Sequence, residues 1–258
     1  MARPIIVIHR GVNVSVLYTL MQAFHSNPRS EIYWITDDDH TSVSYATKVS
    51  ISGLMDEADQ LAGIYSHQSI NTHEFELFCF QRWFVLKEFM ARYSIASCLA
   101  LDSDVLLYSS TNEMEKHLGE FELAVSEEGS PHCLFVNSQQ AIQEICESIM
   151  ETFKLIKANK AVGSHLSQLS DMTIFDAFTK ANKHRVALIN SIRDGTTIDH
   201  NIQCDHGFTM LDGRKKILWK KRKPYGFIRS TGESVRFHAL HLQGAGKSEI
   251  GDYYNQLK

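Results

Sequence analysis

The sequence has few of the residues that divide a chain into parts or cross-link it. Only four prolines occur in 258 residues, and no stretch rich in serine, glycine or proline is longer than a turn, so no linker separates two domains. The cysteines are odd in number, scattered and without a C-x-x-C pair, which argues against a disulfide framework or a cysteine zinc site. They are Cys79, Cys98, Cys133, Cys146 and Cys204. Their pattern predicts reduced thiols in a cytoplasmic protein.

Long apolar runs and an excess of positive charge are also missing. Charged residues between Arg82 and Arg92 interrupt the best candidate for a membrane span, and no signal peptide is recognisable, so we expect no transmembrane segment. A formal net charge of −4 argues against broad binding to nucleic acid. The exception is the run from Arg214 to Lys223, where seven of ten residues are basic. It predicts either a solvated hairpin or a patch for anionic substrates or weak contact with an acidic membrane surface.

The first 36 residues have the pattern of an α/β fold. Pro4 to Ile8 form a continuous apolar run, typical of a strand that is buried on both faces. Apolar residues between Val14 and Phe24 recur at three- and four-residue intervals and predict a helix. Ile32 to Thr36 give a second strand. This order predicts a parallel crossover, whose ligands bind at the carboxyl edge of the strands.

Several polar side chains follow those two strands and are expected at that edge. His9 and Arg10 come directly after the first strand, and Asp37 opens a run of three aspartates after the second. One of those carboxylates, for which we take Asp37, can bind a base or a ribose hydroxyl. The alternative for the aspartate run is a solvated turn.

Two aspartates interrupt the apolar run from Cys98 to Tyr108. Asp102 and Asp104 flank a single small residue, Ser103. A carboxylate in an apolar strand is costly to desolvate, whereas two at the end of a strand can bind one divalent cation and, through it, phosphate oxygens. The alternative is that the two residues end one strand and begin the next.

A cation stands within the apolar stripe of the clearest predicted helix, which covers residues 75–93. Its apolar residues are Phe75, Phe78, Cys79, Leu86, Phe89, Met90 and Tyr93. Arg82 falls inside this stripe, where a guanidinium needs an anionic partner. That partner is expected to be Asp102, Asp104 or a bound phosphate, and the alternative is a structural pair with an unrelated carboxylate.

Further elements predicted along the chain lead to a second motif. We expect helices at 112–118, 138–157 and 172–181, strands at 121–126 and 133–136, a hairpin at Asp212-Gly213 and a strand at 235–242. Within that last strand His238 and His241 would point to opposite faces, so one ion could use only one of them. His241 is followed by Gly244 and Lys247, a combination suited to a metal ion and a diphosphate.

The pair of motifs, Asp102-x-Asp104 and His241-x-x-Gly244-x-x-Lys247, resembles metal-dependent glycosyltransferases of the GT-A fold, especially the galactosyltransferase and glycogenin-like family. The resemblance implies one GT-A domain over residues 1–258, with a mixed, mostly parallel central sheet flanked by helices. Residues 1–110 would form the nucleotide-binding half and residues 111–258 the acceptor-binding half.

The resemblance also implies ligands and roles. It implies a nucleotide-sugar donor such as a UDP-sugar, held through Mn²⁺ or Mg²⁺, and transfer of the sugar to a hydroxyl of a glycan or another acceptor. The implied metal ligands are Asp102, Asp104 and His241. The implied donor-binding residues are Arg82, Asp102, Ser103, Gly244 and Lys247, beside His9, Arg10 and Asp37.

A further carboxylate is needed near the acceptor. Asp171 is the candidate, as a general base if the reaction inverts the anomeric centre or as a positioning group if it retains it. The alternative is a helix N-cap, a role open to Ser170 or Asp171. Ser170-Asp171-Met172 replaces the family's Asp-Gln, and Ser248-Glu249 replaces its Pro-Trp after the motif lysine.

Two other functions fit parts of the sequence. A haloacid-dehalogenase-like phosphatase also has D-x-D after an apolar strand, with the first Asp, here Asp102, as nucleophile. Leu106 stands where such enzymes have Thr or Val, and their motif lies near the start of the chain. A non-catalytic module that binds nucleotide sugars would keep the donor site and lack an effective base.

Overall fold

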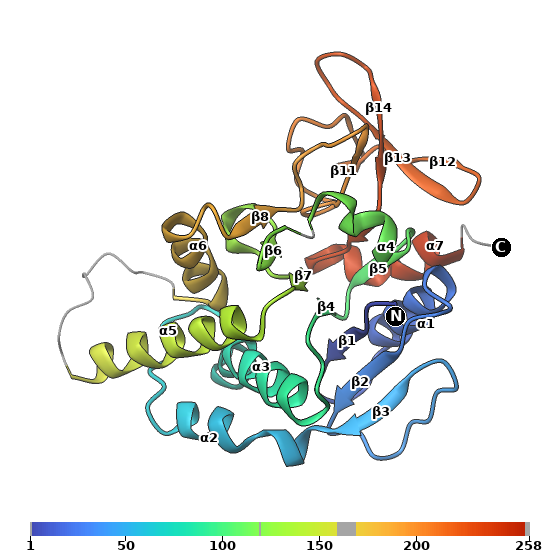
Figure 1. Ribbon diagram of the computed structural model, residues 1–258. Coiled ribbons are helices and arrows are strands. Elements are labelled where there is room, and N and C mark those ends of the chain that lie inside the picture. Colours follow the sequence, from blue (N-terminus) through green and yellow to red (C-terminus); the bar gives the residue numbers. More distant parts are fainter. Residues whose placement is uncertain (1, 119, 159–168, 256–258) are drawn as a thin grey trace.

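A seven-stranded mixed sheet forms the centre of the computed structural model, which describes residues 2–118, 120–158 and 169–255 (Figure 1). The strand order is β3-β2-β1-β4-β7-β6-β8. The strands are β1 (Ile5–Ile8), β2 (Ile32–Thr36), β3 (Thr47–Ser50), β4 (Cys98–Leu101), β6 (Leu123–Val125), β7 (Cys133–Val136) and β8 (Val186–Leu188). β7 runs antiparallel to β4 and β6, and the other neighbours are parallel. The mixed, mostly parallel α/β class expected from the sequence is confirmed.

The strand order reverses between β1 and β4. The chain first adds β2 and β3 on one side of β1 and then returns to place β4 on the other side. Val7 of β1 pairs with Leu101 of β4, so the segments that follow, beginning at His9 and Asp102, leave the sheet beside each other. The carboxyl edge at such a reversal is where open α/β sheets bind ligands.

Helices cover both faces of the sheet (Figure 1). α2 (Asp56–Ala62), α3 (His73–Arg92), α5 (Gln139–Lys157) and α6 (Asp171–Ala181) pack on one face, where Ile6, Ile8 and Ile35 join their apolar side chains. α1 (Val14–Ser26) and α4 (Thr111–Met114) cover the other face, and α7 (Ile250–Asn255) packs on α1. Short 3₁₀ turns are η1 (Ile51–Leu54), η2 (Glu115–His117), η3 (Glu127–Gly129) and η4 (Gly244–Glu249).

A second, smaller β structure projects from one end of the molecule (Figure 1). Its four-stranded sheet has the order β12-β13-β14-β9. The strands are β9 (Thr196–Thr197), β12 (Leu218–Lys220), β13 (Lys223–Phe227) and β14 (Ser234–Phe237). A hairpin of β10 (Met210–Leu211) and β11 (Arg214–Lys215) lies nearby, and β15 (Ala239–His241) pairs antiparallel with β5 (Val105–Leu107). An apolar cluster that includes Leu106, Phe208 and Phe237 joins these parts.

The buried face of α1 agrees with the predicted one at Leu20 but not at its two ends. Val14 and Phe24, expected inside, are 63% and 40% exposed, whereas Val16 is fully buried. Polar residues share the buried face: Gln22 donates a hydrogen bond from Nε2 to the carbonyl oxygen of Leu107 at 2.6 Å. A buried amide that satisfies the backbone of a neighbouring strand is not visible to a hydropathy pattern, and this explains the error.

The buried face of α3 likewise agrees with the prediction at Leu86, Phe89 and Met90 but not at its ends. Phe75 and Tyr93 belong to the predicted stripe but are about half exposed. Glu76 is buried instead, because its carboxylate accepts hydrogen bonds from Ser69 Oγ at 2.8 Å and Asn71 Nδ2 at 2.7 Å. These two donors come from the loop before the helix and compensate the desolvation of the charge.

The segment predicted as one strand, 235–242, is two strands in different sheets. β14 ends at Phe237 and β15 begins at Ala239, so His238 marks the break. Other boundaries agree closely: β7 begins and ends where the sequence predicted, and Ser138 is the N-cap of α5. β3, α2 and β8 had no clear sequence signal. None of the described helices has the length and apolar character needed to cross a lipid bilayer.

Candidate active site

The D-x-D segment forms a tight turn between β4 and β5. The backbone N–H of Asp102 donates to the carbonyl oxygen of His132 at 2.8 Å, and the N–H of Val105 donates to the carbonyl oxygen of Asp102 at 3.3 Å. Asp102 and Asp104 therefore stand on either side of Ser103 at the edge of the sheet. Their side chains are 25% and 5% exposed, so one carboxylate of the pair is almost fully removed from water.

β15 brings His241 to this turn. His241 pairs with Val105 in the β5–β15 ladder, and the N–H of Leu242 donates to the carbonyl oxygen of Asp104 at 2.9 Å. His241 Nε2 lies 3.5 Å from Asp104 Oδ1. One ligand atom from each of Asp102, Asp104 and His241 lies within 4.8 Å of the other two. The structure thus brings together the three residues that the motifs nominated.

This donor set suits a hard divalent cation. Asp104 Oδ1 is buried and has no hydrogen-bond partner in the described part of the chain. His241 donates from Nδ1 to the carbonyl oxygen of His200 at 2.6 Å, so Nε2 is the nitrogen that faces the carboxylates. Two carboxylates and one imidazole are ligands that Mn²⁺ and Mg²⁺ accept. The residues therefore fit the metal that the resemblance implied.

Electrostatics at the cluster separate the two aspartates. Burial raises the pKa of Asp102. Burial also opposes ionisation of Asp104, but its contacts with His241 and Lys247 hold the pKa of Asp104 well below its usual range. Burial opposes the charge on His241, yet the neighbouring Asp104 raises the pKa of His241 above its ordinary value. Asp104 is thus the carboxylate that stays ionised most firmly.

The segment after β15 returns a lysine to the same carboxylate. Gly244 has φ +61°, a left-handed conformation that favours glycine, and it turns the chain into η4. Lys247 Nζ then lies 3.1 Å from Asp104 Oδ2, with its side chain 47% exposed. His9 is close as well: its burial and the charge of Lys247 lower the pKa of His9.

Arg82 links the D-x-D turn to α6. Its guanidinium forms ion pairs with Asp102 and, at 2.9 Å, with Asp171 Oδ2. Trp83 Nε1 donates to the same Asp171 oxygen at 3.0 Å, and the N–H of Met172 donates to Asp171 Oδ1 at 2.8 Å. Both oxygens of this buried carboxylate are therefore engaged. The N-cap of α6 is Ser170, and Asp171 is the first helical residue.

Arg10 and Asp37 lie at the neighbouring strand ends with different partners. The N–H of Gly11 donates to Asp37 Oδ1 at 2.5 Å, which ties the loop after β2 to the loop after β1. Arg10 donates from Nη2 to Gln81 Oε1 at 3.3 Å and lies 4.6 Å above the ring of Phe78. Within the described residues no carboxylate forms an ion pair with Arg10.

Three residues beside the cluster, His132, Asp199 and Lys215, carried no sequence signal. His132 stacks on His241 with ring centroids 4.1 Å apart and an angle of 8°. Its Nε2 bonds to the carbonyl oxygen of Asp199 at 3.0 Å. Asp199 in turn forms a buried ion pair with Lys215. A lone histidine before a strand and a lysine within a basic run do not stand out unless the fold is known.

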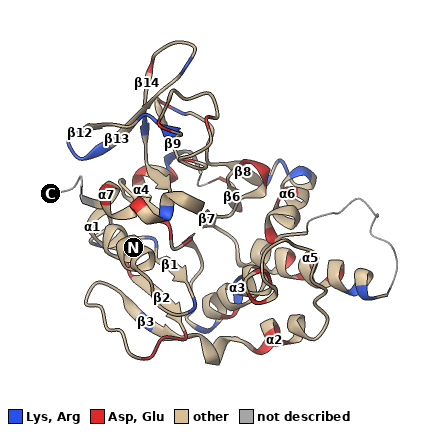
Figure 2. Ribbon diagram, turned by 180° about the vertical axis from the view of Figure 1, so that it is seen from behind, with Lys and Arg blue, Asp and Glu red and all other residues tan. Residues whose placement is uncertain are grey.

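The basic run from Arg214 to Lys223 includes part of a hairpin, as one of its two interpretations predicted, but it is not solvated throughout. It spans β11, β12 and the start of β13. Lys215 is buried, Arg214 forms an ion pair with Glu249, and Lys223 Nζ lies 3.8 Å from Glu113. Figure 2 shows blue at the turn between β12 and β13. A continuous membrane-binding patch over the whole run is not supported.

Comparison with known proteins gives matches in structure alone. No family model and no curated protein sequence matches the chain. A solved structure of the galactosyltransferase LgtC, with donor and acceptor sugar analogues, is 15% identical with a TM-score of 0.53, over 99% of this chain and 96% of that one. An active-site mutant of LgtC is 14% identical with the same TM-score, over 98% and 95%.

A more distant likeness involves only part of another protein. The glycosyltransferase GlyE of Streptococcus pneumoniae TIGR4 is 16% identical with a TM-score of 0.40, over 72% of this chain and 45% of that one. The chain thus spans less than half of GlyE but nearly all of LgtC. From the match to LgtC along its whole length, this chain has the GT-A glycosyltransferase fold that its two motifs implied.

Proposed function

We propose that this protein is a metal-dependent glycosyltransferase that uses a nucleotide-sugar donor such as a UDP-sugar. The observation that carries the proposal is the convergence of Asp102, Asp104 and His241 on one point at the β1–β4 strand reversal. Lys247, after β15, and Arg82, within α3, border that point. A cluster of this charge and chemistry is suited to a diphosphate, and the GT-A fold supports a sugar as the group transferred.

Asp102, Asp104 and His241 would hold the metal. When bound, Mn²⁺ or Mg²⁺ supplies positive charge to the donor diphosphate and so favours its departure. Lys247 would add a second positive charge at the phosphates, since its side chain is about half exposed and its ammonium already lies at the cluster. Gly244, in its left-handed conformation, lets the backbone approach the diphosphate closely.

The nucleotide would lie over the ends of β1 and β2. Arg10 has an amide and an aromatic ring as its described partners, which leaves its charge available for a phosphate or another anion. His9 lies near Lys247 and Asp104. Asp37 has one oxygen engaged by Gly11, and the other would serve a ribose or base. Ser103 lies between the two aspartates, and its hydroxyl group can donate a hydrogen bond to the nucleotide sugar.

Asp171 is proposed as a positioning residue. Both of its oxygens accept hydrogen bonds from Arg82, Trp83 and Met172, so neither is ready to take a proton from an acceptor hydroxyl. Its role would be to hold Arg82 toward the donor. The hydroxyl acceptor, a glycan or another molecule, would approach from the side of residues 111–258.

The cysteines, which are all free thiols, support a cytoplasmic location.

The test is donor hydrolysis without an acceptor. A panel of UDP- and GDP-sugars is incubated with the intact chain and Mn²⁺, Mg²⁺ or EDTA, and the released nucleotide is measured. We expect metal-dependent release from one donor and a rise in melting temperature when that donor and metal are added together. Binding without release would favour the non-catalytic module, and an aspartyl-phosphate on Asp102 would favour the phosphatase. Full activity in EDTA would contradict the proposal.

A further inference from the structure

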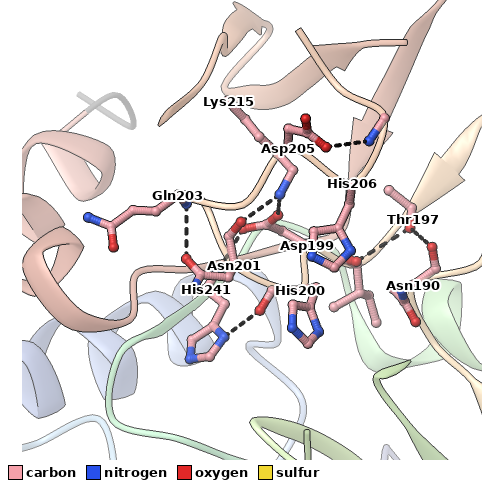
Figure 3. A network of polar contacts seen from close by, with 12 residues as sticks. Asn190, Thr197, Asp199, His200, Asn201, Gln203, Asp205, His206, Lys215 and His241 are labelled. Atoms are coloured by element: carbon pink, nitrogen blue, oxygen red, sulfur yellow. Dashed lines mark hydrogen bonds and ion pairs between the residues drawn. The ribbon is translucent and has the colours of Figure 1, made fainter. Parts of the chain in front are cut away.

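We propose that Asp199 and Lys215 form a positioning pair that sets the orientation of His241, so that metal affinity depends on two residues that do not face the metal. This inference rests on the proposed function, because it takes His241 as a metal ligand. Figure 3 shows Lys215 and Asp199 bound to each other, with His241 nearby in the same network.

The pair is a fully buried charge pair. Lys215 Nζ lies 2.7 Å from Asp199 Oδ1, and the two side chains are 1% and 0% exposed. The same ammonium donates to the carbonyl oxygen of Asn201 at 2.5 Å. Taking both charges out of water is expensive, and a buried pair is often no more stable than apolar residues of similar volume. Stability alone therefore does not explain why this position holds a lysine.

Asp199 and its neighbour His200 both bind His241. Asp199 Oδ2 accepts a hydrogen bond from the backbone N–H of His241 at 3.2 Å. The carbonyl oxygen of His200 accepts from His241 Nδ1 at 2.6 Å. Lys215 binds the residue on either side of His200, so it fixes the carbonyl group that orients the ring.

Backbone hydrogen bonds place the lysine beside this segment. The N–H of Lys215 donates to the carbonyl oxygen of Ile202 at 2.8 Å, and the N–H of Ile202 donates to the carbonyl oxygen of His241 at 3.0 Å. The N–H of Asp199 donates to the carbonyl oxygen of Ala239 at 3.0 Å. Residues 199–202 are thus tied to β15 at both ends, and the hairpin that carries Lys215 is tied to them.

The result is a histidine with one nitrogen committed. Because Nδ1 donates to a carbonyl oxygen, Nε2 is the nitrogen directed at Asp104, and it would offer its lone pair to a bound metal ion. A metal-bound histidine commonly donates its other N–H to a carboxylate or carbonyl group, and loss of that partner typically costs 10- to 100-fold in metal affinity. Here the partner is a carbonyl group whose position depends on a buried ion pair.

The first experiment compares Lys215→Met with Lys216→Met in the intact chain. Lys216 is the next residue, is exposed and lies over Phe227, so it receives the same chemical change outside the network. The Mn²⁺ dissociation constant is measured without donor, from the electron paramagnetic resonance signal of free Mn²⁺. We expect Lys215→Met to raise it about 10-fold and Lys216→Met to leave it unchanged. Equal affinities for wild type and a folded Lys215→Met would overturn the inference.

A double variant separates positioning from stability. Lys215→Met alone leaves the charge of Asp199 buried and unpaired, which can unfold the chain. Asp199→Asn with Lys215→Met removes both charges, so the melting temperature should recover toward the wild-type value while Mn²⁺ still binds about 10-fold more weakly. If affinity recovers together with stability, the pair is only structural.

A third measurement is made on the wild-type chain, and a variant serves only to assign its signals. Histidine-selective ¹⁵N NMR with Mg²⁺, assigned with His241→Ala, should show a proton on Nδ1 of His241 and none on Nε2. The opposite protonation would overturn the inference. A wild-type chain that binds neither Mn²⁺ nor Mg²⁺ would overturn the proposed function as well, whereas normal binding in the folded double variant would overturn only the positioning role.

Discussion

His241 and Val105 face each other in the antiparallel ladder between β15 and β5. This pairing places a side chain from near the end of the chain beside Asp104, the residue before Val105. The N–H of Leu242 donates to the carbonyl oxygen of Asp104 at 2.9 Å and extends the contact by one residue. The candidate metal cluster is therefore built into a backbone ladder and does not depend on a flexible loop.

The two aspartates should be needed for donor turnover. Asp102→Asn and Asp104→Asn keep the shape of each side chain but remove a charge from the cluster. We expect metal-dependent nucleotide release to fall about 100-fold, equivalent to ~3 kcal/mol, with the circular dichroism spectrum unchanged. Serine in place of Cys204, a partly exposed residue outside the cluster, is the control. Activity in the aspartate variants close to wild type would contradict the assignment.

The two histidines at the end of β14 and in β15 should differ. His238 Nδ1 bonds to Ser109 Oγ at 2.8 Å, away from the aspartates, whereas His241 Nε2 faces Asp104. We expect His241→Ala to raise the Mn²⁺ dissociation constant at least about 10-fold and His238→Ala to leave it unchanged. Isothermal titration calorimetry measures the Mn²⁺ dissociation constant of each variant. An equal loss of affinity in both would contradict the assignment of His241 as the metal ligand.

Replacing Lys247 should strengthen metal binding but slow the turnover of the nucleotide-sugar donor. In the structure its ammonium occupies Asp104 Oδ2 at 3.1 Å and so opposes the binding of another cation. We expect Lys247→Met to strengthen Mn²⁺ binding without donor about 3-fold and to lower donor turnover about 100-fold. Lys220→Met, in exposed β12, is the matched control. Weaker metal binding in Lys247→Met would contradict the antagonism.

Asp171→Asn should distinguish a positioning group from a general base. Because Arg82 and Trp83 both donate to Asp171 Oδ2, an amide there keeps one acceptor but weakens the pair with the guanidinium. We expect turnover to fall about 10-fold, with the pH profile of kcat unchanged in shape. If the acidic limb of the kcat–pH profile disappeared and turnover fell by far more than 10-fold, Asp171 would be the general base. Unchanged turnover would exclude both roles.

Gly129 should be essential to the packing of α6. Its φ is +69°, and a Cβ there would lie 2.3 Å from Asp176 N and from Met172 O. We expect Gly129→Ala to lower the free energy of unfolding by about 3 kcal/mol or more, because backbone atoms cannot yield cheaply. Gly195→Ala is the control, since φ is +66° but no atom lies within 4 Å. Gly195→Ala should lower the free energy of unfolding by only about 1 kcal/mol. Urea denaturation of both variants measures the difference, and equal losses would contradict the packing argument.

Much of the fold was accessible from local patterns. The apolar runs of β1, β4 and β7 are buried along their whole length, and a strand buried on both faces has no other composition available to it. The order of strand and helix at the start of the chain also predicted the parallel crossover. The motifs around Asp102 and His241 nominated the three residues that meet in space.

The sequence was a poorer guide to which face of each helix is buried. Val14 and Phe75 have the right spacing for a buried stripe but face solvent, because the packed faces of α1 and α3 include polar side chains with partners elsewhere. Hydropathy records the average preference of a residue for burial and cannot record a hydrogen bond to a distant strand.

The sequence by itself determined the chemistry available: two carboxylates at a strand end, a histidine and a lysine after a late strand, and an arginine in an apolar helix. Only the tertiary structure decided which groups meet. The break at His238, the stacking of His132 on His241 and the burial of Lys215 against Asp199 all depend on pairing between distant segments. Such pairings are set by the packing of the whole chain, and local spacing carries no information about them.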